Sequence, residues 1–305
     1  MSAAGDREGN SPTLRGLLAS VRAAVRSTPP RDLFLITVPL PTLLVAVSLM
    51  PGTDAWQLSL ATEGVFESRW ALWTAFASSF VHTDPVHLVD NVVNYWLLVA
   101  VAYPLSIVAG WRRRLLRSVV VYLAVVPLVS AWATIVTLGG VTDALTAGFS
   151  DVNSALLGYL VAVWFAALAA ECDRVRSETP AGVDPRWSVV VAFASLALAY
   201  LAPSGAGYFP PLPAVGSLFA VGAVLAAAGL YTAVGRPQVA GLDLGPEREL
   251  LYVTGASVAA AGVIGSLVLV PFGSNVFAHL AGYVVGFTVP FLGVLADGTA
   301  GRGGS

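Results

Sequence analysis

Long apolar runs alternate with short polar breaks along most of the chain. Eight apolar segments can be marked off, of which the fifth is the shortest: 33–50, 86–109, 118–138, 150–171, 188–203, 215–234, 250–270 and 276–296. A helix of about 20 apolar residues crosses the hydrocarbon core of a bilayer. The pattern therefore predicts an all-α polytopic membrane protein with about eight spans.

Composition supports the same class. Of the 305 residues, 56% are hydrophobic and 11% are charged, and the mean hydropathy is +0.77. A soluble domain carries about 25% charged residues, so this chain is too apolar to be one. The net charge of −2 gives no reason to expect nucleic acid as a partner, and the single cysteine, Cys172, excludes an intramolecular disulfide and a cysteine-based metal cluster. The expected surroundings are the lipid bilayer of the cell membrane.

Basic residues predict the orientation. The chain has 16 arginines and no lysine. If both termini lie in the cytoplasm, so do three arginine-bearing breaks, WRRRLLR (111–117), ECDRVRSE (171–178) and GRPQVAGLDLGPERE (235–249). Fifteen arginines then lie inside and only Arg69 lies outside, as the positive-inside rule favours. Residues 1–32, which lack the apolar core of a signal peptide, and residues 297–305 are predicted to be cytoplasmic tails.

Polar residues gather where three spans begin, and the predicted topology puts all three beginnings at the outer face. Ser150 opens GFSDVNSALLGY (148–159), His87 follows FVHTDP, and His279 lies in NVFAHLAGYVVGF (275–287). Polar side chains inside a span are costly and usually face the interior of the bundle. His87 and Asn91 are four residues apart, so they share a helical face and can donate hydrogen bonds to one point. His82 is expected at the membrane interface.

Small residues recur at a spacing of four in two spans. The stripes are Ser150, Ser154 and Gly158 in one span, and Ala278, Gly282 and Gly286 in the other. Such stripes let two helix backbones approach closely. Packed on these faces, the spans bring Ser150 next to His279. A serine beside a neutral imidazole is an activated nucleophile, and donors nearby stabilise an oxyanion.

Simpler interpretations exist for each feature. Stripes of small residues usually serve helix packing alone, and a serine that opens a helix is usually an N-cap, where Asp151 and Asn153 also suit the helix dipole. No carboxylate-plus-histidine spacing supports a metal site made from the three histidines, so neither a metal nor a cofactor is predicted. These interpretations leave unexplained why serine, histidine and asparagine gather at one leaflet.

Taken in order, these motifs resemble the rhomboid family of intramembrane serine proteases. HLVDN (87–91), preceded by Phe80 and His82, is similar to the family's H-x-x-x-N and F-x-H. GFSDVNSALLGY is similar to the G-x-S-G motif that starts at Gly148, with the helix behind it. AHLAGYVVG (278–286) is similar to A-H-x-x-G-x-x-x-G. The motifs cover about 30 residues, and the six-helix core that they imply would cover much of 33–296.

The resemblance implies a function. Ser150 would be the nucleophile and His279 the general base, in a dyad without a carboxylate. His87, Asn91 and backbone N–H groups around Ser150 would form the oxyanion hole. The reaction would be hydrolysis of peptide bonds in or near the transmembrane segments of membrane-protein substrates, with no metal or cofactor.

Three departures from the family pattern stand out. Asp151 replaces the second glycine of G-x-S-G, where it would crowd the contact between the two striped spans or oppose an oxyanion. Ser154 stands where some members have a tyrosine that packs on the histidine. Two spans are additional to a six-helix core, and 188–234 is predicted to be an inserted hairpin.

Two alternatives remain at the level of sequence. A rhomboid-like pseudoprotease would bind membrane clients without cutting them, and Asp151 is the residue that favours it. A transporter or channel would carry inverted repeats and polar residues at mid-span, and the sequence shows neither.

Overall fold

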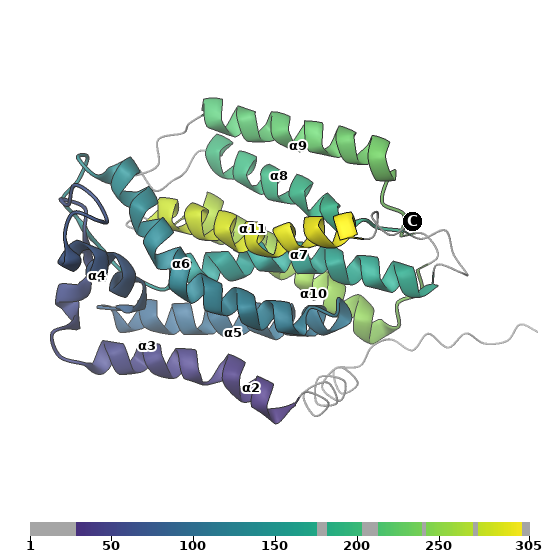
Figure 1. Cartoon of the computed structure of the whole chain (residues 1–305). Coiled ribbons are helices and arrows are strands. Elements are labelled where there is room, and N and C mark those ends of the chain that lie inside the picture. The colour runs from purple at the N-terminus through teal and green to yellow at the C-terminus, as the bar shows by residue number, and fades with distance from the viewer. Residues whose placement is uncertain (1–28, 176–181, 203–212, 240–241, 271–273, 301–305) are drawn as a thin grey trace, which may run out of the picture.

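The computed structural model describes residues 29–175, 182–202, 213–239, 242–270 and 274–300, and most of them form long helices that lie side by side (Figure 1). The elements in chain order are α2 (Pro30–Thr37), α3 (Pro39–Leu49), η1 (Thr53–Trp56), β1 (Leu58–Ser59), α4 (Arg69–Ala77), η2 (Ser78–Phe80), α5 (Pro85–Val108), α6 (Arg112–Leu138), β2 (Leu145–Thr146), α7 (Ser150–Val175), η3 (Pro185–Trp187), α8 (Ser188–Leu201), α9 (Pro213–Val234), α10 (Pro246–Val263), η4 (Ile264–Val268) and α11 (Val276–Ala300).

The predicted class, an all-α multi-pass membrane protein, is confirmed. Within the described residues, seven helices are long and apolar enough to cross a membrane, with α2 and α3 counted together. The fifth predicted span corresponds to a shorter apolar helix, Pro185–Leu201. The first helix begins at Pro30 and the last runs to Ala300, so the helices extend slightly into both predicted tails. Residues 1–28 and 301–305 of those tails lie outside the described residues.

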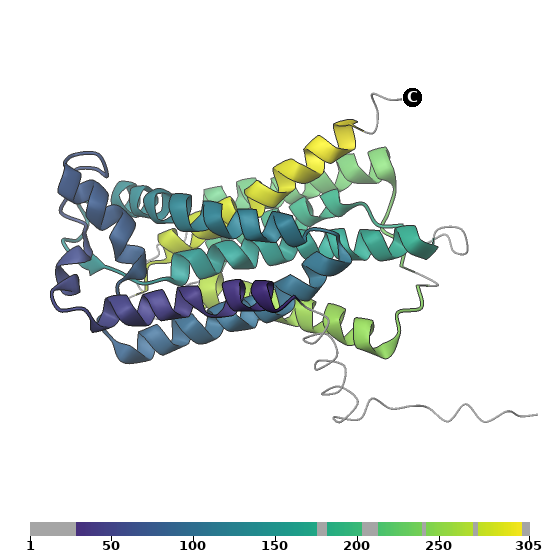
Figure 2. The same cartoon turned by 60° about the horizontal axis from the view of Figure 1, so that its bottom comes forward.

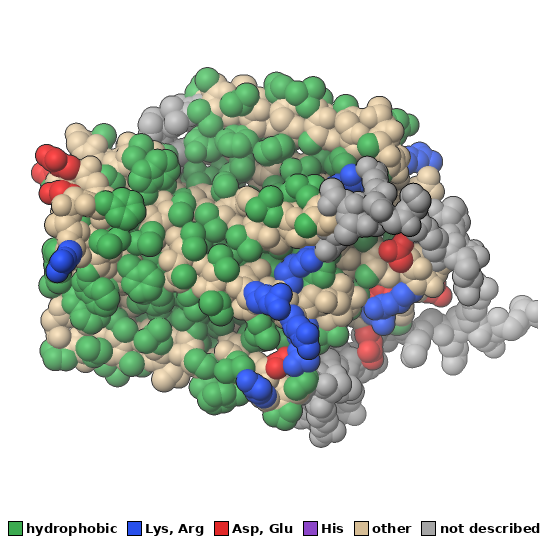
Figure 3. Space-filling model, in the orientation of Figure 1, with side chains coloured by type: hydrophobic (Ala, Val, Ile, Leu, Met, Phe, Trp, Pro, Cys, Tyr) green, Lys and Arg blue, Asp and Glu red, His purple; other side chains and the backbone are tan. Residues whose placement is uncertain are grey.

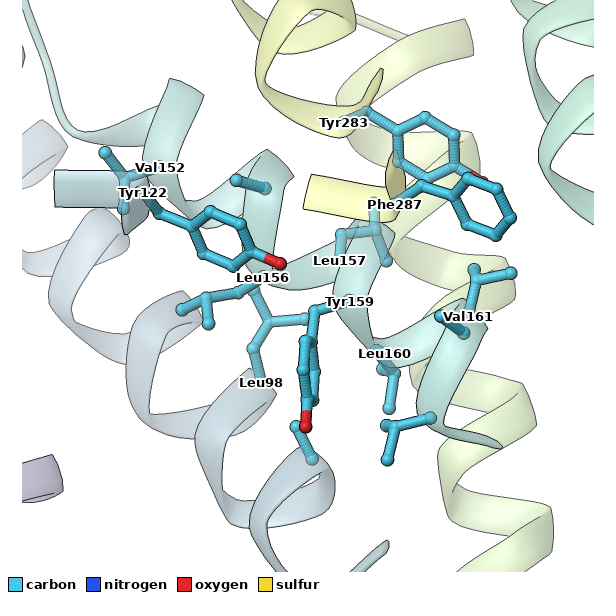
Figure 4. Packing of buried hydrophobic residues seen from close by; sticks show 14 of the residues in the cluster. Leu98, Tyr122, Val152, Leu156, Leu157, Tyr159, Leu160, Val161, Tyr283 and Phe287 are labelled. Atoms are coloured by element: carbon cyan, nitrogen blue, oxygen red, sulfur yellow. The ribbon is translucent and has the colours of Figure 1, made fainter. Parts of the chain in front are cut away.

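Helix α7 is the centre of the bundle. Of its most apolar 18-residue window, 83% is buried, and α5, α6, α8, α10 and α11 all pack around it. Tyr159 on α7 and Tyr283 on α11 are fully buried, and the Tyr122 hydroxyl of α6 donates to the Gly286 carbonyl at 2.7 Å (Figure 4). Because α7 is enclosed by helices on all sides, a residue at its first turn is fixed relative to most of the bundle.

The glycines of both small-residue stripes lie where α7 contacts α11, but Gly282 and Gly286 meet Asp151 and Ala155 rather than the predicted Ser150 and Ser154. A Cβ atom built on Gly286 would lie 2.0 Å from the Ala155 carbonyl oxygen, and one on Gly282 would lie 2.1 Å from the Asp151 carbonyl oxygen. A Cβ on Gly158 would lie 2.3 Å from the carbonyl oxygen of Tyr283. No side chain fits at these distances, so the glycines are what permits the close approach.

The first turns of two helices are set by side-chain caps. The Asp84 carboxylate accepts a hydrogen bond from the Val86 N–H at 3.0 Å, and Pro85 occupies the first helical position of α5. The Ser68 hydroxyl accepts from the Ala71 N–H at 3.0 Å at the start of α4. Both are preferred N-cap arrangements. They fix the residues at which α4 and α5 begin.

Helices α8 and α9 form an antiparallel pair at the edge of the bundle (Figures 1 and 2). Only 6% of the apolar window of α9 is buried, and its main neighbour is α8. Gly182 and Gln238, before and after the pair, exchange two backbone hydrogen bonds of 2.8 Å. Adjacent ends and a peripheral position fit the inserted hairpin predicted for 188–234, which stays a prediction.

Charged side chains lie mainly at the two ends of the molecule. Figure 3 shows a broad hydrophobic surface, with most basic side chains gathered at the end opposite α4. The starts of α5, α7 and α11 lie at the α4 end, and the start of α2 and the end of α11 lie at the other (Figures 1 and 2). The arginine-rich end is the one that the sequence assigns to the cytoplasm, and this orientation stays a prediction.

Candidate active site

Ser150 and His279 are in direct contact. Ser150 is the first residue of α7 and His279 lies in the first turn of α11. The serine Oγ is 2.7 Å from Nε2 of the imidazole, and Nδ1 of the same ring is 2.8 Å from the Ser266 carbonyl oxygen. A carbonyl oxygen can only accept, so Nδ1 carries the ring proton and Nε2 accepts from the serine hydroxyl. This is the tautomer that a general base requires.

The Ser266 carbonyl belongs to η4, a stretch of π-helix that continues α10. The Leu269 N–H bonds the Ile264 carbonyl at 2.7 Å, the five-residue spacing of a π-helix. Such stretches are rare and are frequently found at functional sites. In this protein the π-helix supplies the acceptor that holds the imidazole of His279.

Asn275 fixes the start of α11. Its side-chain oxygen accepts from the Ala278 N–H at 3.1 Å, and its amide nitrogen donates to the hydroxyls of Thr134 at 2.8 Å and Thr146 at 3.3 Å. Thr134 lies on α6 and Thr146 on β2, two residues before Gly148. One amide therefore ties the histidine helix to the segment that leads into Ser150.

A polar cavity of about 190 Å³ opens beside the dyad. Ser150, His279, His87 and Asp151 line it together with residues from loop 51–85, α6 and the segment before α11. Gly148 lies against His87: its φ is +131°, and a Cβ there would be 2.6 Å from Cε1 of the imidazole. The motif glycine is therefore required both by backbone conformation and by the space that His87 occupies.

Asn91 is placed behind the cavity, which differs from the predicted oxyanion role. Its amide nitrogen donates to His82 Nε2 and to the His87 carbonyl, each at 3.1 Å. Its side-chain oxygen accepts from Asn153 at 3.1 Å, and Asn91 is not among the residues that line the cavity. With both amide hydrogens engaged, Asn91 supports the residues around it. Of the two predicted oxyanion residues, the structure brings only His87 to the cavity.

His82 is buried, with 6% of its surface exposed, so the expected interfacial position is wrong. Its Nε2 accepts from Asn91 and, at 3.3 Å, from the Phe149 N–H just before Ser150. Burial, with a smaller contribution from His87, lowers the pKa of His82 to about 4. The neutral ring is therefore a fixed acceptor that joins α5 to the start of α7.

The Asp151 side chain points away from the contact between α7 and α11, so the expected crowding does not occur. One carboxylate oxygen accepts from Ser79 at 2.7 Å and from Ser130 at 2.5 Å, and the other accepts from the Val152 N–H at 2.7 Å. Asp151 faces Gly282 with main-chain atoms. The carboxylate thus lies on the α6 side of the cavity and takes no part in the hydrogen bond between Ser150 and His279.

The helix start offers one further donor. No described residue accepts a hydrogen bond from the Ser150 N–H, whereas the Val152 and Asn153 N–H groups are bonded to Asp151 and Phe149. The Ser154 hydroxyl turns back to the Ser150 carbonyl at 2.8 Å. Within the described residues, no three His, Cys, Asp or Glu side chains lie close enough to hold a metal ion.

Several residues of the site escape the sequence patterns. Ser79 and Ser130 lie in segments that show only apolar runs with scattered hydroxyls. The role of Ser266 rests on its backbone carbonyl, which the identity of its side chain cannot reveal.

Comparisons with family models, curated proteins and solved structures find no match for the chain. The functional interpretation therefore rests on the geometry of the site.

Proposed function

We propose that this protein is an intramembrane serine endopeptidase of the rhomboid type. The observation that carries the proposal is the chain of contacts from Ser150 Oγ through the imidazole of His279 to the Ser266 carbonyl, at 2.7 and 2.8 Å. It contains a nucleophile, a base and a group that orients the base, which are the three parts of serine catalysis.

The reaction follows from these roles. Ser150 Oγ attacks the carbonyl carbon of a peptide bond while Nε2 of His279 takes the hydroxyl proton. The tetrahedral intermediate expels the amine, which receives that proton from His279, and leaves an acyl group on Ser150. Water, deprotonated by the same imidazole, then attacks the ester and frees the serine. Each proton that leaves Oγ or water returns to a product or to Ser150.

Negative charge on the carbonyl oxygen needs donors close to Ser150. The Ser150 N–H at the start of α7 and the imidazole of His87 in the cavity are the groups available for this role. The positive end of the α7 dipole adds to them. Asn91 and His82 act as positioning residues, because they hold the His87 backbone and the Phe149 N–H.

The place of the cavity suggests the substrate. It lies at one end of a bundle of membrane-crossing helices, where the starts of α5, α7 and α11 meet. A peptide bond can reach Ser150 there when it lies in or near a transmembrane segment of another protein. Polar lining residues give water access to the same point, as hydrolysis requires.

Labelling with a fluorophosphonate in liposomes tests the proposal. The parent is expected to react, and Ser150→Ala and His279→Ala are each expected to lower the rate by at least about 1,000-fold, because the dyad acts as a unit. Ser48→Ala is the matched control, since Ser48 lies on α3 and donates to Leu44 within its own helix. Its rate should equal that of the parent.

A folded parent that fails to react would overturn the proposal. The remaining role for the fold would then be the binding of membrane clients without cleavage. Folding is judged independently, by a single symmetric peak in size-exclusion chromatography and a cooperative thermal transition in detergent.

A further inference from the structure

Three carboxylates are buried within the described residues, and they are compensated differently. Asp32 pairs with Arg112, and Glu171 pairs with Arg174 at 2.8 Å and also with Arg248. Asp151, with 3% of its surface exposed, has no arginine or histidine nitrogen within 4.0 Å among the described residues. Burying a carboxylate without a cation is costly, and arginine offsets this cost at Asp32 and Glu171 but not at Asp151.

The uncompensated carboxylate lines the cavity next to the dyad. Within the described residues, its hydrogen-bond partners are the hydroxyls of Ser79 and Ser130 and the Val152 N–H. No arginine is among the residues that line the cavity, and the chain has no lysine. The imidazoles of His82, His87 and His279 also line the cavity, and none of them has a nitrogen within 4.0 Å of the Asp151 carboxyl group. The cavity therefore presents a buried carboxyl group that has no cation paired with it among the described residues.

Further hydroxyl and amide groups line the same cavity as this carboxylate. Thr134, Thr146 and Asn275 line the cavity beside Ser79 and Ser130. An ammonium or guanidinium group has several N–H donors and needs several acceptors to replace its water. A carboxylate with nearby hydroxyls meets that need through charge-assisted hydrogen bonds, whereas an apolar side chain in the same place would leave the carboxylate desolvated and unpaired.

We propose that the Asp151 side of the cavity binds a basic side chain of the substrate, lysine or arginine, at the residue whose carbonyl carbon Ser150 attacks. The inference rests on the proposed function and adds a substrate class to it. Suitable substrates carry a basic residue at the end of a transmembrane segment that lies level with Ser150. Asp151 is then a specificity-determining residue.

Side-chain-bearing phosphonates test this directly. Diphenyl aminoalkylphosphonates react when Ser150 Oγ attacks phosphorus and phenoxide leaves, so the side chain beside phosphorus is presented to the cavity. A lysine-type probe is compared with a norleucine-type probe, which has the same four-carbon side chain without the terminal ammonium group. The parent should react with the lysine-type probe at least about tenfold faster, the factor that a hydrogen bond to a charged group provides.

Two variants localise the effect. Asp151→Asn should lower the ratio of the two rates to about one, because the amide keeps the shape and loses the charge. Asp143→Asn removes one negative charge from an exposed position eight residues before Asp151, and it should keep the parent ratio. Using a ratio within each variant removes general effects on the reactivity of Ser150.

A measurement on the parent protein tests the inference even if Asp151→Asn fails to fold. Butylammonium chloride should slow the lysine-type probe several-fold more than sodium chloride at the same concentration, because the alkylammonium competes for the carboxylate.

The outcomes separate the two proposals. If plain fluorophosphonate labels the parent and the lysine-type probe is no faster than the norleucine-type probe, the basic-side-chain inference is overturned and the protease proposal stands. If the ratio survives in Asp151→Asn, the preference has another origin and the role of Asp151 is overturned. If no phosphonate or fluorophosphonate labels a folded parent, both proposals fall together.

Discussion

Two histidines at the same end of the bundle are almost equally buried and differ in what their nitrogens do. His279 places Nε2 on the Ser150 hydroxyl and Nδ1 on a backbone carbonyl. His82 uses Nε2 to accept two N–H groups, from Asn91 and Phe149. The first arrangement leaves a ring nitrogen able to take a proton from a hydroxyl. The second makes the ring a structural acceptor. Burial alone does not distinguish these two roles.

The lowered pKa of His82 predicts that stability depends on pH. In the unfolded chain the ring titrates near 6.5 and in the folded protein near 4. Between these values the unfolded state binds more protons, so the free energy of unfolding rises with pH. Stability is therefore highest above pH 6.5 and falls as pH drops toward 4, by about 3 kcal/mol for a shift of this size. Thermal unfolding in detergent from pH 7 to pH 4 measures the loss.

His82→Gln serves as the comparison, because glutamine keeps an acceptor for Asn91 and cannot take up a proton in this range. Its melting temperature at pH 7 should be lower than that of the parent, and its further decrease toward pH 4 should be clearly smaller. Parallel losses in parent and variant would show that other groups cause the acid sensitivity.

At the scale of elements, the π-helix η4 decides how the base is held. A regular α-helix engages each carbonyl with the N–H four residues later. In η4 the pattern shifts to five residues, and the Ser266 carbonyl accepts from the imidazole of His279. The orienting group of the dyad is thus a backbone atom, set by the path of α10 against α7 and α11 rather than by a side chain.

Replacing single peptide bonds by esters tests this role. An ester between residues 266 and 267, made by placing the hydroxy-acid analogue of leucine at 267, weakens the Ser266 carbonyl as an acceptor. We expect fluorophosphonate labelling to slow about three- to tenfold, the usual worth of one hydrogen bond. Nitrogen-15 spectra of labelled histidine should also show a smaller fraction of the tautomer protonated on Nδ1.

The same replacement at Val268 is the matched control. It also removes one N–H from η4, but it weakens the carbonyl of Leu267 and leaves that of Ser266 as an amide. If both esters slow labelling equally and neither changes the histidine spectrum, η4 is only a structural segment and does not orient the base.

For the whole molecule, sequence patterns predict the elements that depend on long apolar runs and on side-chain identity. They predict the helical spans, the glycine contact between α7 and α11, and the approach of Ser150 to His279, because a spacing of four fixes which residues share a face. They miss the burial of His82 and the serines around Asp151, since these depend on how loop 51–85 and α6 fold over the start of α7. The fifth span, predicted at 188–203, is helical from 185 to 201, and the additional helicity in residues 185–187 follows from the Asp184 cap.

The distribution of arginine predicts which end of the molecule faces the outside. The predicted topology assigns fifteen of 16 arginines to the side of the membrane opposite Ser150, so that side should be cytoplasmic. Two exposed valines allow a matched test in a Cys172→Ala background: Val141 lies at the Ser150 end with 78% of its surface exposed, and Val239 lies at the other end with 53% exposed. In intact cells a membrane-impermeant maleimide should label Val141→Cys and leave Val239→Cys unlabelled until the membrane is permeabilised. The reverse pattern would place Ser150 on the cytoplasmic side, and water and substrates would then have to reach the dyad from there.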